Sequence, residues 1–79
     1  MIVWHVCGLG KLRRYFANGG FIRRPVRAWE SFEEAKRFSL QTCRPFIIRL
    51  KFPNSCKRLE GHKGKAFVLN EPYKIEGKF

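Results

Sequence analysis

The side chains best suited to chemistry in this chain are two histidines and three cysteines, namely His5, Cys7, Cys43, Cys56 and His62. Structural zinc sites usually pair cysteines about two to four residues apart, and no two of these cysteines have that spacing. A nucleophile pair made of Cys43 and His62 would lack a third group to orient it. The chain contains no Asp, so acid–base chemistry would depend on Glu or on the two histidines. We therefore predict no metal site, no cofactor and no assigned catalytic residue.

Basic side chains far outnumber acidic ones. The 79 residues include 17 Lys and Arg against six acidic residues, a formal charge of +11, and the isoelectric point is near 10.4. All six acidic residues lie after position 29. Charge of one sign on so small a body attracts polyanions. The predicted polyanion-binding residues are Lys11, Arg13, Arg14, Arg23, Arg24, Arg27, Lys57, Arg58, Lys63 and Lys65. The predicted partner is nucleic acid, a nucleoprotein complex or an acidic protein surface.

Two segments combine charge with features that suit phosphate or nucleobase binding. Phe21 stands next to Arg23 and Arg24 in sequence, which offers stacking and charge together for a flexible nucleic acid strand. The run 61–65 places two glycines beside two lysines, and such backbone can approach a phosphate closely. The same run also fits a plain turn between strands. Both interpretations of 61–65 stay open at this stage.

The order of the helices and strands that must position these residues, as the sequence predicts them, indicates an α+β fold. Residues 2–7 are β-branched and aromatic, Val26 to Trp29 follow a proline, and residues 46–52 alternate with the period of a half-buried strand. The full expected order is βαβαβββ, with strands at 2–7, 26–29, 46–52, 66–69 and 73–76 and helices from Leu9 to Phe16 and from the Ser31 cap to Thr42. We expect a single domain over residues 1–79, in which a small, mostly antiparallel sheet carries two helices packed on one face.

Local signals also predict which side chains are buried. Ser31 and Glu34 have the spacing of a capping box at the start of the second helix. In the first helix, Leu9, Leu12 and Phe16 recur at helical spacing and predict its apolar face. The predicted core consists of Phe32, Phe38, Ile48, Leu50, Phe52 and Phe67.

Composition limits the setting in which the protein works. No apolar run approaches the roughly 20 residues needed to span a bilayer. Residues 1–5 lack the pattern of a secretion signal. Three cysteines in a chain without that signal indicate free thiols in a reducing compartment. These observations predict a cytoplasmic protein with no membrane partner.

Several short motifs, in order along the chain, resemble a group of short uncharacterised bacterial and phage proteins. The motifs are His5-Val6-Cys7, Gly19-Gly20, Pro25-Val26-Arg27, Thr42-Cys43-Arg44 and Gly61-His62. This sequence departs from the group at Cys7, where Thr is usual, and at Cys43, where Gly is usual. The resemblance implies a fold and an origin in small genes of mobile elements, and it carries no activity of its own. For a phage-encoded protein with this charge, we expect a use as an inhibitor of a host nucleoprotein such as a defence complex.

The layout is also loosely similar to a minimal ADP-ribosyltransferase or RNA 2′-phosphotransferase core. That resemblance would give His5 a ribose contact, Trp29 the role of the stacking aromatic residue, and Glu71 the late carboxylate. Val6-Cys7 departs from the Gly-Thr that follows the histidine in those enzymes.

Three functions from different classes follow from the sequence. The main prediction is a non-enzymatic basic module that binds an anionic surface. The first alternative is a transferase-like enzyme that uses His5. The second is a contact subunit for an acidic protein partner.

Overall fold

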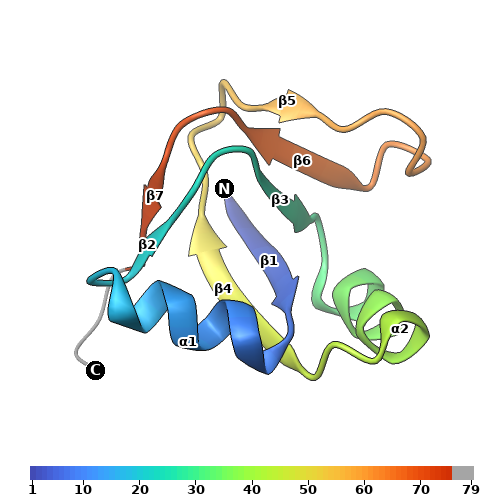
Figure 1. The fold of residues 1–79 in the computed structure, drawn as a ribbon. Coiled ribbons are helices and arrows are strands. Elements are labelled where there is room, and N and C mark those ends of the chain that lie inside the picture. Colours follow the sequence, from blue (N-terminus) through green and yellow to red (C-terminus); the bar gives the residue numbers. More distant parts are fainter. Residues whose placement is uncertain (76–79) are drawn as a thin grey trace.

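The computed structural model describes residues 1–75 and forms an α+β fold with nine regular elements (Figure 1). In chain order these are β1 (Ile2–Cys7), α1 (Leu9–Ala17), β2 (Phe21–Ile22), β3 (Val26–Trp29), α2 (Phe32–Thr42), β4 (Phe46–Lys51), β5 (Lys57–Arg58), β6 (Ala66–Leu69) and β7 (Tyr73–Lys74). The predicted class and most of the predicted order are confirmed. The structure adds two short strands, β2 and β5. Residue 76 of the predicted last strand lies outside the described residues.

The strands form a five-stranded sheet in the order β4-β1-β3-β6-β5 and a two-stranded sheet of β2 and β7. The predicted mostly antiparallel arrangement is confirmed. β1 pairs with β4 along its whole length, from Ile2 opposite Lys51 to Cys7 opposite Phe46. β1 meets β3 at one residue pair only, Trp4 opposite Trp29. Beyond that pair the two strands are not held together by a ladder.

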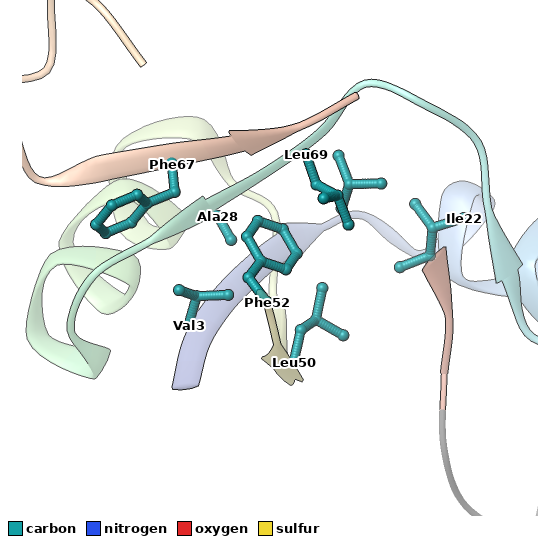
Figure 2. Close-up of a cluster of buried hydrophobic side chains, with 8 residues drawn as sticks. Val3, Ile22, Ala28, Leu50, Phe52, Phe67 and Leu69 are labelled. Atoms are coloured by element: carbon teal, nitrogen blue, oxygen red, sulfur yellow. The ribbon is translucent and has the colours of Figure 1, made fainter. Parts of the chain in front are cut away.

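The hydrophobic core lies where β1, β3, β4 and β6 face the small β2–β7 sheet. Val3, Val26, Leu50 and Phe52 are almost completely buried, and Figure 2 shows Phe52 in the middle of the cluster. Burying side chains of this size is the main stabilising contribution in a domain this small. The cluster is formed by Val3, Ile22, Val26, Ala28, Leu50, Phe52, Phe67 and Leu69.

The predicted core is confirmed for Leu50, Phe52 and Phe67, which are buried, and Phe38 and Ile48 are half-buried. The prediction for Phe32 is wrong, because its side chain is 44% exposed. Phe32 is the first residue of α2, where only one side of the ring reaches the sheet. That side contacts Trp4 edge-on, with 5.4 Å between the ring centroids.

The first helix buries only part of its predicted apolar face, because Leu12 is half-buried while Leu9 and Phe16 are exposed. None of its residues is fully buried, and Leu9 and Phe16 are each more than 40% exposed. Tyr15 instead packs against the core, and its ring lies 5.8 Å from that of His5. Trp4, the neighbour of His5 on β1, contacts α2 through Phe32. Since consecutive side chains of a strand point to opposite faces, the two helices approach β1 from different sides and not from one face as predicted.

The second helix begins and ends at well-defined caps. The Glu34 backbone N–H donates to Ser31 Oγ at 3.3 Å, which confirms half of the predicted capping box. The Glu34 carboxylate accepts a bond from Lys65 Nζ at 3.1 Å. At the other end Cys43 adopts the left-handed conformation, with φ of 54°. That conformation reverses the chain after α2 and fixes where the next residue, Arg44, emerges.

Candidate functional site: a basic, aromatic pocket

The described structure contains a pocket of about 570 Å³. Residues of β1, α1, β2, β3, α2 and β6 line it, together with residues of the loops between these elements, among them Leu59 and His62 after β5. In Figure 1 the end of β1 lies between α1 and α2. The lining includes five cations (Lys11, Arg14, Arg23, Arg27 and Arg44), four aromatic rings (Tyr15, Phe21, Trp29 and Phe38) and two imidazoles (His5 and His62). No carboxylate is among the lining residues.

Three of these cations lie near the C-terminal end of β1, around His5. Lys11 and Arg14 lie one turn apart on α1, and Arg44 follows the end of α2. Lys11 and Arg44 both act electrostatically on His5, where they help to lower its pKa. Arg14 acts in the same way on the neighbouring Tyr15. The positive charge of two separate helices therefore converges on the His5–Tyr15 pair.

Arg44 is held in place by the way in which α2 ends. Its backbone N–H donates to the carbonyl of Ser39 at 3.1 Å, and Ser39 Oγ donates to the Arg44 carbonyl. Ser39 is buried, so both bonds lie in a protected part of the structure. The backbone of Arg44 is thereby fixed while its side chain is free to extend over the pocket.

The aromatic side chains form a continuous wall next to these cations. The Trp29 ring centroid lies 5.3 Å from that of Phe38 and 5.3 Å from that of His62, which is nearly perpendicular to it. The Arg44 guanidinium lies 5.9 Å from the Phe38 ring centroid, within the range of a cation–π contact. Arg44 therefore joins the cationic part of the pocket to the aromatic part.

His5 lies at the base of the pocket with both ring nitrogens engaged. Nδ1 lies 2.6 Å from the backbone carbonyl of Arg27, and Nε2 lies 3.0 Å from the Tyr15 hydroxyl. A carbonyl oxygen can only accept, so in the neutral ring Nδ1 carries the proton and Tyr15 donates to Nε2. Burial lowers the pKa of His5 from its ordinary value of 6.5, the Arg27 carbonyl opposes this, and Lys11 and Arg44 lower the pKa further. Neutral His5 is thus a fixed, uncharged part of the floor.

The structure brings only some of the predicted residues together. Lys11, Arg14, Arg23, Arg27 and His5 line the pocket. The remaining predicted residues, which are Arg13, Arg24, Lys57, Arg58, Lys63 and Lys65, are not among its lining residues. Arg24 borders a separate shallow hollow with Phe21, Ile22, Arg23 and Pro72.

Two of these outer cations already have carboxylate partners. Lys65 Nζ lies 3.1 Å from Glu34 Oε1. Arg58 lies 4.0 Å from a Glu30 carboxylate oxygen, donates to the Gly64 carbonyl and stacks over the Phe67 ring at 4.7 Å. Their charge is therefore partly used within the protein.

The run 61–65 forms a turn, as one of its two interpretations predicted. Gly61 and Gly64 have positive φ, and the Lys65 backbone N–H donates to the His62 carbonyl at 2.9 Å. The turn brings the His62 ring to the aromatic wall, while Lys63 is exposed outside the lining.

Sequence reasoning missed Arg44, Tyr15 and Phe38 as parts of the site. Arg44 stands alone in sequence, so the clusters of basic residues gave no reason to select it. The available signal was the helix end before Pro45, which restricts the Arg44 backbone. Tyr15 lies at the edge of the apolar face that Leu9, Leu12 and Phe16 predict on α1, so their spacing gave no reason to select it.

Other kinds of site find less support in the described residues. No group of three or more His, Cys, Asp or Glu among residues 1–75 could hold a metal ion. Over the same residues, neither helix combines the length and apolar character that crossing a membrane requires.

Comparisons with protein-family models, curated proteins and solved structures give no match to this chain. The function is therefore argued from the pocket itself.

Proposed function

We propose that the protein binds a nucleic acid strand without catalysing a reaction, and that the basic, aromatic pocket is the binding site. The observation that carries this proposal is the composition of the lining, in which five cations and four aromatic rings surround a hollow without a carboxylate. Arginine and lysine neutralise phosphates, and aromatic rings stack on exposed bases. Both requirements of a flexible strand are met within one pocket.

A single strand suits this pocket better than a duplex. Stacking on Trp29 or Phe38 requires a base whose face is free, which a paired base inside a helix does not offer. Lys11 and Arg14 of α1 line the pocket, so two basic residues of this helix are directed to the pocket and not to the groove of a duplex. We therefore expect single-stranded RNA or DNA to bind more tightly than duplex DNA of the same length.

An acidic protein surface is the less favoured partner. Carboxylates would satisfy the cations but leave the wall of Trp29, Phe38 and His62 without a matching group. The transferase alternative is also less favoured. Glu71, its late carboxylate, is exposed and outside the lining, and both nitrogens of His5 are engaged within the protein.

The test is a fluorescence-anisotropy titration of labelled single-stranded RNA, single-stranded DNA, duplex DNA and polyglutamate at several salt concentrations. Each neutralised phosphate of a single strand contributes a slope of about −0.7 in log K against log salt, so three contacts would give about −2. Polyglutamate binding as tightly as the strands, or no strand binding at low salt, would overturn the proposal. NAD consumption that is lost in His5→Ala would favour the transferase alternative.

A matched pair of variants locates the binding site. Lys11→Gln/Arg14→Gln removes two pocket cations and should lower the salt slope by more than 1. Arg49→Gln/Lys51→Gln removes two exposed cations of β4 that lie outside the pocket and should leave binding within about twofold of the parent. Equal losses in the two variants would mean that net charge, and not the pocket, drives binding.

The cytoplasmic location and the inhibition of a host defence complex stay predictions of the sequence. Binding a nucleic acid strand is compatible with both, since such a protein could occupy the substrate of a nucleoprotein.

A further inference from the structure

We infer that the pocket recognises a phosphomonoester attached to a nucleoside, either the phosphorylated end of a strand or a free nucleoside monophosphate. This inference rests on the proposed function and names the chemical group that the site selects.

The first argument is the charge of Lys11, Arg14 and Arg44, which we call the inner wall of the pocket. Lys11, Arg14 and Arg44 gather around the His5–Tyr15 pair and place up to three positive charges there. A phosphodiester within a strand carries one negative charge, whereas a phosphomonoester carries about 1.5 to 2 at neutral pH. The monoester matches this wall better than the diester does.

The second argument is that these three cations have no carboxylate partner among the residues that the structure describes. The ion pairs found among residues 1–75 join Glu34 to Arg37 and Lys65, and Glu30 to Arg58. None of them includes a cation of the inner wall. The two arginines can each present two parallel N–H groups to phosphate oxygens. The charge that gathers at this wall is therefore available to an external anion.

The third argument is the floor of the pocket. His5 is buried, and its ring is fixed between the Arg27 carbonyl and the Tyr15 hydroxyl. Its lowered pKa keeps it uncharged, so it neither adds to nor cancels the charge of the wall. A fixed, neutral floor beside these cations holds a small anion at one position rather than along a groove.

The fourth argument is size and the position of the aromatic wall. A volume of about 570 Å³ lies within the usual range for small-molecule pockets, about 300–1,000 Å³. Arg44 touches Phe38, and Phe38 touches Trp29, so a base could stack within one nucleotide's reach of the phosphate. The pocket thus has room for a single nucleotide with its phosphate on the cations and its base on the rings.

The experiment compares strands that differ only at one end. Labelled single-stranded octamers carry a 5′-hydroxyl, a 5′-phosphate, a 5′-methylphosphate or a 3′-phosphate, and free nucleoside monophosphate and inorganic phosphate serve as competitors. The methylphosphate keeps the atoms of the phosphate but carries one charge less. We expect one phosphorylated end to bind at least tenfold more tightly than both the hydroxyl and the methylphosphate end.

Variants connect this preference to the inner wall. Arg44→Gln should reduce the tenfold preference to less than threefold, while Arg49→Gln should retain it. If Arg44→Gln alters the far-ultraviolet circular dichroism spectrum, Lys11→Gln provides a second test of the inner wall. Loss of the preference in Arg49→Gln to the same extent would overturn the assignment to the wall.

The competitors distinguish the two sources of the group. Displacement by nucleoside monophosphate at concentrations close to those of the phosphorylated octamer would identify a free nucleotide as the ligand. Displacement only by the octamer would identify a strand end. If all strand ends bind equally, the inference fails while strand binding stands. If no strand binds but nucleoside monophosphate does, the proposed function fails while the pocket's preference stands.

Discussion

Two phenylalanine-to-alanine substitutions test how the sheet and its core are assembled. Phe52 is 1% exposed, whereas Phe32 is 44% exposed, so the same chemical change removes very different buried surfaces. Truncating a fully buried Phe costs about 3–5 kcal/mol, through lost transfer free energy and the cavity left behind. Phe52→Ala also removes the ring contact with Tyr73, whose centroid lies 6.0 Å away.

Phe32→Ala should cost much less. Its ring contributes the edge-on contact with Trp4, and such aromatic pairs contribute about 0.5–1.5 kcal/mol beyond burial. A whole domain is stable by only about 5–15 kcal/mol. We therefore expect Phe52→Ala to be near the limit of folding and Phe32→Ala to remain clearly folded.

Urea denaturation followed by circular dichroism measures the loss of unfolding free energy in both variants, and heating followed by the same signal measures their melting temperatures. In a domain of this size, 1 kcal/mol shifts the melting temperature by about 4–8 °C, so Phe52→Ala should melt at least 12 °C below the parent. Equal losses of unfolding free energy in the two variants would refute the assignment of Phe52 to the centre of the core.

Three further predictions concern hydrogen bonds. The pKa of His5 is lower in the folded protein than its ordinary 6.5. The unfolded chain therefore binds more protons, and the free energy of unfolding should fall as pH decreases below 6.5. Denaturation at several pH values, with His5→Gln as the control, measures this dependence. Tyr15→Phe leaves Nε2 of His5 without its donor and should cost about 1–3 kcal/mol in the same assay. Ser31→Ala removes the cap of α2 and should cost about 0.5–2 kcal/mol, visible as a lower urea midpoint.

The parts of the fold with strong local signals could be predicted from the sequence. Val26–Trp29 forms the strand expected after Pro25, and α2 ends at Thr42 as expected before Pro45. The two-residue strands β2 and β5 could not be predicted, because only their partners β7 and β6 define them. Pairing of this kind depends on the folded chain and leaves almost no local pattern.

The pocket could be predicted only in part, because it depends on elements far apart in sequence. The cluster of basic residues near the N-terminus included Lys11 and Arg14, which both line the pocket. Arg44 joins them only because α2 ends beside α1, which no local pattern records. The spacing of Leu9, Leu12 and Phe16 indicated the inward side of α1 only in part, because Leu12 is half-buried but Tyr15, which contacts His5, is turned inward in place of Leu9 and Phe16.

The position of β1 between β4 and β3 has a consequence for the order in which the protein folds. The first strand to be synthesised pairs with β4, and Ile2 lies opposite Lys51. On the ribosome, β1 therefore cannot form its hydrogen bonds with β4 until most of the chain has emerged. Contacts between distant parts of a chain also slow folding, because the intervening loop must first be closed. We expect a nascent chain that ends before β4 to leave the apolar strand Ile2–Cys7 exposed to chaperones.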